Sequence, residues 1–504
     1  MGTMGFLQRL RWLQICGLVA GLAIAQFAHS PLPAQAQPVA TCQLSNEQIL
    51  QKEQLRQAAL QGDRESFSRY QQLVERQASD LQDCRNENWP RNQAIWVRLY
   101  PCDARPGALE QVLDVLVNKG YNQVYVEVFG AGQVLLPRAD NPTVWPSVVR
   151  SPGYENRDLL AEAIAKGQER GLKVYAWMFS MNVGYSYLQR PNGTQSLALN
   201  GYGQTSLEAL QSGGLNSAGE VNAEEVFIDP YNSQARTDYS TLVQSVVRRR
   251  PDGVLFDYIR YPRGVGAASV AGRVQDLWIY GSAAQQAFYQ RSLNRSADAL
   301  SRRFLQRGYI TAQDIVEMEA FGEPQPLWQG YNPDPAYAQS TPDQRRAYVQ
   351  QQLWRLGIGH AFQGVLDFLA LGSQPVTQQG IPAGAVFFPE GNQSIGESGI
   401  DSRLQPWDRF STSMQWHPMS YATCGRADCI VAQIQRVLQV APDDTKVMPV
   451  LAGRWGEPIS GRPALEAQMN AIRQAAPQIQ TVSHFALSWQ EPEFDRVRKS
   501  CQLQ

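Results

Sequence analysis

From residue 94 onward, short apolar runs alternate with stretches in which apolar residues recur with the period of a helix. The short runs are rich in β-branched and aromatic residues and are mostly continuous, which is typical of parallel strands buried on both faces. There are eight of them, which predicts a (β/α)8 barrel. They are AIWVRLY from Ala94, QVYVEVF from Gln123, KVYAWMF from Lys173, GVLFDYI from Gly253, AGAVFF from Ala383, SMQWHPMSY from Ser413, KVMPVLA from Lys446 and VSHFALSW from Val482.

Helical patterns separate these runs, for example at 108–119, 157–170, 234–249, 429–440 and 463–474. An open, doubly wound sheet is the alternative architecture. Such a sheet usually has a glycine-rich turn after its first strand, and this sequence has none. The pattern therefore favours the closed barrel.

Two connections are too long to be simple loops, namely 182–227 after the third strand and 263–340 after the fourth. Both would emerge at the carboxyl-terminal face of the barrel, where barrel enzymes carry their sites. Long loops at that face usually form lids or walls of a site, although a decorative insertion is the alternative.

Residues 37–93 are dominated by Gln, Glu, Arg and Leu, which are good helix formers. Thin apolar stripes on both sides of Gly62-Asp63 predict a helical hairpin, with Asp63 as the N-cap of the second arm. We expect this hairpin to be an accessory element that packs against the barrel of residues 94–504. The expected fold is thus an α/β TIM-like barrel with an N-terminal hairpin and long insertions after strands three and four.

Residues 1–36 are predicted to be a signal peptide. Arg9 and Arg11 precede an apolar stretch at 13–27, and Ala34-Gln35-Ala36 offers a small-x-small cleavage site. An uncleaved membrane anchor is the alternative, but the apolar stretch is shorter than the roughly 20 residues that a spanning helix needs. We therefore expect an exported protein, periplasmic or extracellular, with no stable membrane insertion after cleavage.

Six cysteines remain after the leader, and an even number in an exported chain suggests disulfides. A helical hairpin broken at Gly62-Asp63 would bring Cys42 and Cys84 to the same open end. Cys424 and Cys429 are close enough for a local loop. Cys102 with Cys501 is then the remaining pair, although the sequence alone leaves the pairing open.

The chain has 504 residues with a formal net charge of −1, and it carries no basic stripe. That balance argues against nucleic acid or an anionic membrane as the main partner. The 12 Trp and 20 Tyr are more informative, because aromatic faces stack on sugar rings as well as filling cores.

The fourth strand continues as DGVLFDYIRYP, from Asp252 to Pro262. Asp257 follows three apolar residues near the end of this strand, where a carboxylate is costly unless it is paired, hydrogen-bonded or functional. Tyr258 and Arg260 come directly after it, and Arg260 could hold the carboxylate ionised. We predict that Asp257 is a catalytic residue and that Tyr258 and Arg260 contact substrate.

Glycoside hydrolysis generally needs two carboxyl groups that flank the scissile bond. Glu390, just after the fifth strand, is the first choice as partner of Asp257, because strands four and five are neighbours. Glu127 in the second strand and Glu491 after the eighth are the other candidates. Asp229, in VFIDPYN, either points into the site or makes the turn into the following helix.

Other polar and aromatic side chains end strands on the same face and would suit hydrogen bonding to sugars or stacking on them. They are Trp177, Trp416, His417, Tyr421 and Trp489. The chain lacks a GxSxG elbow, a P-loop, a dinucleotide fingerprint and zinc-ligand spacing, so we expect no cofactor and no metal.

Several motifs in this order resemble those of the family 10-like glycosyl hydrolases, a group that includes bacterial peptidoglycan glycan-strand hydrolases. The resemblance covers roughly residues 93–490. It rests on AIWVRLY, GYNQVYVEVFGAGQVLLPR, PGYENRDLLAEAIAKGQERGLKVYAWMF, FIDPYNSQARTDY and DGVLFDYIRYP. It implies a barrel hydrolase acting on amino sugar polymers or related glycans outside the cytoplasm.

Carried over residue by residue, the resemblance places Asp257 on the first acid after the DG-x-x-F run and Asp229 on the acid of the LDP motif. The sequence departs from the family at Tyr258, where the pattern has a second Asp, and at Ser180-Met181-Asn182, where it has N-P-Y.

The sequence leaves three functions open. The first is an exported hydrolase that cleaves a polymeric glycan, such as peptidoglycan glycan strands, with paired carboxyl groups. The second is a non-catalytic glycan-binding or envelope scaffold protein on a degenerate barrel, and the third is a transglycosylase.

Overall fold

The structure is a computed structural model that describes residues 42–211, 225–325 and 327–503. The predicted signal peptide, residues 1–36, lies outside this part of the chain. None of the helices in the described ranges is both long enough and apolar enough to cross a membrane.

Eight parallel strands close into a barrel, because the first strand pairs with both the second and the last. The predicted barrel is thereby confirmed, and each predicted apolar run overlaps one of its strands. A short strand, β3 (Gln133–Val134), adds to β2 in antiparallel orientation. The barrel strands in spatial order are β1 (Asn92–Val97), β2 (Gln123–Gly130), β4 (Lys173–Phe179), β5 (Gly253–Asp257), β7 (Ala383–Phe387), β10 (Gln415–Ser420), β11 (Val450–Ala452) and β12 (Thr481–Phe485).

Alternate residues of these strands point into the barrel, as the pleat of a strand requires. Large aromatic rings fill the interior. The Trp96 ring meets the rings of Tyr125 and Trp177 edge to face, with centroids 5.0 Å and 4.9 Å away. The barrel interior is therefore a packed core beneath its carboxyl-terminal mouth.

Helices surround the barrel, and five of them match the predicted helical segments. The connection from β7 to β10 instead contains the short strands β8 (Ser394–Ile395) and β9 (Gly399–Asp401) and a 3-10 turn at Trp407–Arg409. The surrounding helices are α3 (Ala108–Asn118), α4 (Leu159–Gln168), α7 (Ser233–Val247), α11 (Pro342–Gln378), α12 (Ala427–Leu438), α13 (Leu465–Ala475), α14 (Leu487–Gln490) and α15 (Pro492–Ser500).

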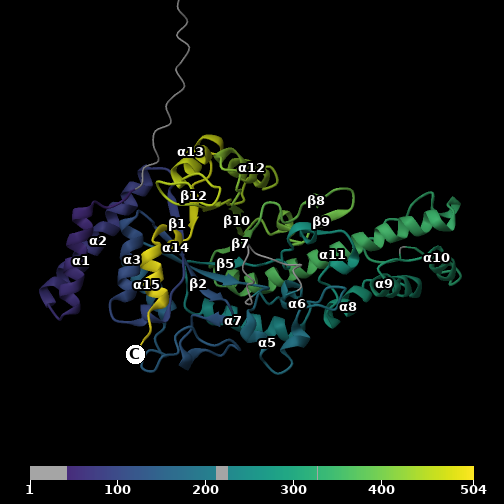
Figure 1. The fold of residues 1–504 in the computed structure, drawn as a ribbon, viewed down its shortest axis with the longest axis horizontal. Helices are drawn as coiled ribbons and strands as arrows, with labels where there is room; N and C mark the ends of the chain where they lie inside the picture. The colour runs from purple at the N-terminus through teal and green to yellow at the C-terminus, as the bar shows by residue number, and fades with distance from the viewer. Residues whose placement is uncertain (1–41, 212–224, 326, 504) are drawn as a thin grey trace, which may run out of the picture. The chain divides into compact units, whose positions relative to one another are not determined.

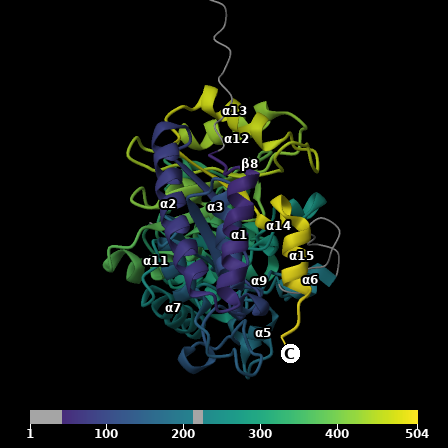
Figure 2. The same cartoon turned by 90° about the vertical axis from the view of Figure 1, so that its left-hand side faces the viewer.

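The N-terminal hairpin consists of α1 (Asn46–Leu60) and α2 (Arg64–Glu87), which lie side by side in front of α3 in Figure 2. Asp63 caps α2, since its carboxylate accepts hydrogen bonds from the backbone N–H groups of Glu65 and Ser66. Asp114 of α3 accepts a hydrogen bond from Tyr70 of α2 at 2.7 Å and pairs with Arg170 at 2.9 Å. This buried network ties the hairpin to the barrel.

Three disulfides join the six cysteines of the described chain: Cys42–Cys84, Cys102–Cys501 and Cys424–Cys429. The pairing expected from the hairpin geometry is confirmed, and so are the local pair and the remaining pair.

The two long insertions follow β4 and β5, as predicted. The first contains α5 (Tyr185–Leu188) and α6 (Ser206–Gln211). The second contains β6 (Val270–Ala271), which pairs with β9, and three helices that pack with the long helix α11 (Figure 1). Those helices are α8 (Ser282–Tyr289), α9 (Arg295–Arg307) and α10 (Ala312–Glu319).

Candidate active site

A cavity of about 160 Å³ lies at the carboxyl-terminal end of the barrel strands. Its walls are mostly aromatic, and one carboxyl group and two guanidinium groups interrupt them. We call it the central cavity. Its lining residues are Trp96, Arg98, Trp177, Phe179, Asp257, Tyr258, Arg260, Val386, Phe388, Met419, Tyr421 and Phe485.

Asp257 is the last residue of β5, and its carboxyl group belongs to the wall of the central cavity with 8% of the residue exposed. The indole N–H of Trp177 donates to Oδ2 at 3.0 Å, and the backbone N–H of Tyr258 donates to Oδ1 at 2.7 Å. Within the described residues no basic nitrogen lies within 4 Å of this carboxyl. Burial raises the pKa of Asp257 to about 6, although both hydrogen bonds and the charge of Arg260 oppose the rise.

Tyr258 turns the chain sharply away from the barrel, since its φ of 49° lies in the left-handed region, which is unusual for a large side chain. The backbone N–H groups of Ser180 and Met181 hold this turn by donating to the carbonyls of Asp257 and Tyr258 at 2.8 Å and 3.1 Å. The Tyr258 ring packs on Phe179, with centroids 4.3 Å apart. Backbone strain of this kind costs on the order of 1–3 kcal/mol and concentrates at functional sites.

Arg260 places a buried cation at the cavity, with 6% of the residue exposed. Its guanidinium donates to the carbonyl of Tyr261 at 2.9 Å and lies 4.6 Å from the Tyr258 ring centroid. No carboxylate of the described chain pairs with it within 4 Å. Arg263 and Arg403 also face the Phe388 ring, so three guanidinium groups gather around one wall of the cavity.

Glu127 is the second acid near Asp257. It lies on β2, which only β4 separates from β5. Its carboxylate pairs with Arg98, with Oε2 and Nε 2.9 Å apart. Burial raises the pKa of Glu127, and the guanidinium of Arg98 opposes that rise. The charge of Glu127 in turn helps to raise the pKa of Asp257, so the two acids share one electrostatic environment.

Of the other predicted site residues, Trp177, Tyr258, Arg260 and Tyr421 line the central cavity with Asp257. Tyr421 continues the inward face of β10, and burial raises the pKa of its hydroxyl well above its usual range. The hydroxyl is therefore a neutral donor at physiological pH.

Glu390 and Asp229 do not line the central cavity. Glu390 lies in the turn after β7 and accepts a hydrogen bond from Gln433 of α12 at 2.6 Å. Asp229 accepts from the backbone N–H groups of Tyr231 and Ala284, both at 2.9 Å, so it caps the start of α8 from a distant segment. Burial raises the pKa of Asp229 to about 6.

The remaining candidates also lie away from the cavity wall. His417 points into the barrel one layer lower, against the Tyr125 ring, and burial lowers its pKa to about 3. Glu491 pairs with Lys119. Trp489 faces the guanidinium of Arg462, and Trp416 packs outside the barrel on Trp407.

Sequence reasoning missed seven wall residues, most of them apolar: Trp96, Arg98, Phe179, Val386, Phe388, Met419 and Phe485. The period of a strand could have found several of them. Trp96 and Arg98 are two residues apart on one face of the first strand, and Trp177 and Phe179 repeat that spacing on the third.

One group of potential metal ligands gathers in the described residues, namely Cys424, Asp428 and Cys429. The two cysteines are joined as a disulfide, so neither offers a thiolate. The group does not belong to the wall of the central cavity.

Comparison with solved structures finds carbohydrate-active enzymes at low similarity. An exo-β-N-acetylglucosaminidase from Vibrio harveyi is 10% identical, with 79% of this chain and 50% of that chain covered and a TM-score of 0.36. A β-N-acetylhexosaminidase from Bacteroides fragilis is 10% identical, with 79% and 61% covered and a TM-score of 0.38. A chitinase from Pseudoalteromonas aurantia is 10% identical, with 81% and 100% covered and a TM-score of 0.36. The chain thus spans about half the length of the Vibrio harveyi enzyme.

Comparison with curated proteins finds no match. A family model does match, over residues 92–290, and its description is Glycosyl hydrolase-like 10. That range contains β1, β2, β4 and β5, and with them Asp257 and the two basic side chains of the central cavity wall. It also contains Glu127, which does not belong to that wall. The segment that carries Glu127 and Asp257 therefore matches the Glycosyl hydrolase-like 10 family.

Proposed function

We propose that this protein is a glycoside hydrolase that cleaves a polymeric glycan, with Asp257 as the acid. One observation carries the proposal: a buried carboxyl with a pKa of about 6, which forms no ion pair with any described residue, belongs to the wall of an aromatic cavity at the barrel mouth. A raised pKa is what a general acid needs in order to hold a proton near neutral pH.

In the proposed reaction, Asp257 transfers its proton to the glycosidic oxygen as the bond from that oxygen to the anomeric carbon breaks. Glu127 is the proposed second acid, in place of Glu390. It is ion-paired with Arg98, which favours its charged form, whereas Asp257 has no such partner in the described part of the chain. A carboxylate at this position acts either as the nucleophile or as the base that activates water.

The charge of Arg260 favours a substrate glycan that carries carboxylates, such as peptidoglycan glycan strands. A buried guanidinium without a carboxylate partner is costly, and an anionic group on the substrate would offset that cost. The wall of the central cavity is mostly aromatic, and such surface suits contact with the apolar faces of sugars. An exported location is part of the proposal and is supported by the three disulfides, which persist in oxidising compartments.

The proposal is tested by incubating the purified protein with glycan strands and following new reducing ends and product masses. A transglycosylase would give products of higher or anhydro mass.

A glycan-binding protein without activity is the second candidate, because Tyr258 stands where the resembled family has an Asp. It would retain the glycan and release no product.

Replacing Arg260 with glutamine is expected to raise KM about 10- to 100-fold on a carboxylated glycan, since a hydrogen bond to a charged group contributes roughly 1.5–3 kcal/mol. On the same glycan with its carboxyl groups reduced to alcohols, the KM of the variant should differ little from that of the wild type. Because Arg260 lowers the pKa of Asp257, the variant should also keep activity to higher pH.

Arg302→Gln removes an equivalent charge from the exposed side of α9 and serves as the control. Steady-state kinetics of both variants on the carboxylated and the reduced glycan test whether Arg260 recognises charge. An equal rise in KM on the carboxylated and the reduced glycan would exclude charge recognition by Arg260.

A further inference from the structure

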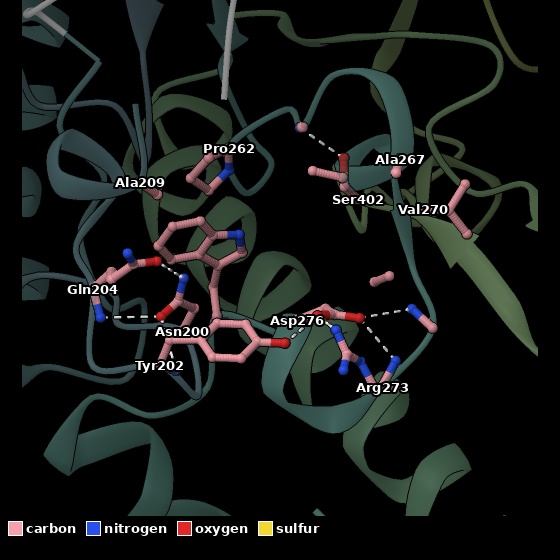
Figure 3. A pocket seen from close by; sticks show the side chains of 15 residues that line it. Asn200, Tyr202, Gln204, Ala209, Pro262, Ala267, Val270, Arg273, Asp276 and Ser402 are labelled. Carbon is pink, nitrogen blue, oxygen red and sulfur yellow. Dashed lines mark hydrogen bonds and ion pairs between the residues drawn. The ribbon is translucent and has the colours of Figure 1, made fainter. Parts of the chain in front are cut away.

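A second cavity, of about 420 Å³, lies where the two long insertions meet (Figure 3). We call it the insertion pocket. The first insertion contributes the segment around Asn200, and the segment after β5 contributes most of the rest. Its lining residues are Asn200, Tyr202, Gln204, Ala209, Pro262, Gly264, Ala267, Ala268, Val270, Ala271, Gly272, Arg273, Asp276, Trp278 and Ser402.

Short-range hydrogen bonds hold the walls of the insertion pocket in place. The side-chain oxygen of Asn200 accepts from the backbone N–H groups of Tyr202 and Gln204, both at 3.0 Å. Asp276 accepts from the backbone N–H groups of Gly272 and Arg273. The Tyr202 hydroxyl then donates to Asp276 at 3.0 Å, which joins the two insertions across the pocket (Figure 3). The pocket is therefore formed before any ligand enters.

A glycine makes this close joint possible. The backbone N–H of Gly201 donates to the carbonyl of Gln275 at 2.8 Å. A Cβ at position 201 would lie 2.4 Å from the Cα of Gln275, closer than real side chains approach. The two insertions thus meet through backbone contact, which gives the pocket a rigid edge.

The insertion pocket contains an indole N–H donor that has no acceptor among the described residues. Trp278 is 4% exposed, and its indole N–H forms no hydrogen bond with any described residue. The indole nitrogen itself remains accessible to solvent, although most of the ring is buried. An N–H that solvent reaches and that no described acceptor occupies can donate to a ligand. This one is available to a molecule in the pocket, as is the side-chain NH2 of Gln204.

The lining favours a sugar over other ligand classes. The ring of Tyr202 is exposed and offers a flat apolar face, and the amide, hydroxyl, indole N–H and carboxylate groups around it offer both donors and acceptors. Arg273 and Asp276 balance in charge, which disfavours phosphates and nucleic acids. A volume of about 420 Å³ lies within the range of ligand sites, whereas the central cavity, at about 160 Å³, is too small for more than part of a glycan chain.

Two segments of the chain run from one cavity to the other. Tyr258 and Arg260 line the central cavity, and Pro262 and Gly264 line the insertion pocket. Two residues of chain span at most about 7 Å, so these walls are close neighbours. The second segment contributes Ser402 to the insertion pocket, while the neighbouring Arg403 faces Phe388 of the central cavity.

We infer that the insertion pocket is a distal sugar-binding site for the same glycan chain whose bond is cleaved at the central cavity. This inference rests on the proposed function. A chain that fills both cavities gains binding energy remote from the reacting bond, and such energy helps to position the bond. The activity should therefore depend on chain length.

Two variants test this inference. Trp278→Phe removes the N–H and keeps a ring, and it should lower kcat/KM on long chains roughly 3- to 10-fold, the effect of one hydrogen bond. Tyr202→Ala removes a ring that is 53% exposed, so the fold should tolerate it, and it should cause a similar or larger loss. On the shortest chains that are cleaved, kcat/KM of both variants should equal that of the wild type. Phe67→Ala, which removes a ring that is 51% exposed on α2 of the N-terminal hairpin, is the control and should change the activity on neither short nor long chains.

A loss that is equal for short and long chains, or no loss at all, would overturn the inference. Binding of a long glycan to each protein, measured by calorimetry on the Asp257→Asn background, separates this failure from that of the proposed function. If the wild type cleaves nothing but Trp278→Phe and Tyr202→Ala weaken binding, the pocket stands and the hydrolase does not. If cleavage is efficient and binding is unchanged in both variants, only the distal site is lost.

Discussion

The Asp257→Asn variant is expected to lose glycan cleavage by about 10²- to 10⁴-fold, the contribution of a positioned general acid, while it becomes more stable at pH 7. Asparagine has nearly the same shape, and its oxygen can still accept a hydrogen bond from Trp177 or Tyr258. It cannot donate the proton that the departing oxygen needs. Assays of reducing ends and thermal unfolding at several pH values measure the two effects.

The gain in stability follows from the sign of the pKa shift. Burial raises the pKa of Asp257 from 3.8 to about 6, so the folded protein binds this proton more tightly than the unfolded chain. The favourable contribution of this protonated carboxyl to the free energy of unfolding is complete below about pH 4 and is lost as the pH rises through 6. A shift of two units corresponds to about 3 kcal/mol, and the asparagine recovers only part of it because one donor loses its acceptor.

The difference in melting temperature between Asp257→Asn and the wild type should therefore be positive at pH 7 and should shrink toward pH 4. Asp229→Asn is the matched control, since its carboxyl also has a pKa of about 6 and also accepts two N–H groups. Asp229→Asn should show the same pH-dependent change in stability. It should retain activity, because Asp229 caps α8 and does not line the central cavity. Full activity of Asp257→Asn would refute its assignment as the acid.

The barrel could be predicted from sequence because its strands are continuous runs of β-branched and aromatic residues. The long helix α11 was not predicted. It contains Pro375 and several glycines, which are poor helix formers. Tertiary packing explains two of them, since a Cβ at Gly364 or Gly372 would lie within 3 Å of side chains on the barrel side. Glycine at these positions lets the helix approach closely.

Asp257 could be placed because it follows directly on an apolar strand, so its position in the pleat is fixed. Glu390 lies three residues beyond the end of β7, where alternation no longer determines direction, and the turn carries it to α12. The insertion pocket was beyond prediction for a related reason. It depends on the contact between Tyr202 and Asp276, which are far apart in sequence and belong to no repeating pattern.

The Glu127→Gln variant should lower kcat by about 10²- to 10⁴-fold with little change in stability. The small change in stability is expected because the side chain of Arg98 is 43% exposed and can be solvated when its partner becomes neutral. A merely structural role of Glu127 would leave kcat nearly unchanged.

The pH profile of Glu127→Gln gives an independent measure of how the two acids are coupled. The negative charge of Glu127 helps to raise the pKa of Asp257, so its removal should shift the loss of activity on the alkaline side to lower pH. Glu390→Gln, the alternative partner by sequence, should retain both the rate and the profile because its carboxylate contacts Gln433 outside the cavity. If Glu390→Gln lost activity and Glu127→Gln did not, the second acid would have to be reassigned to the turn after β7, and that turn would have to move during catalysis.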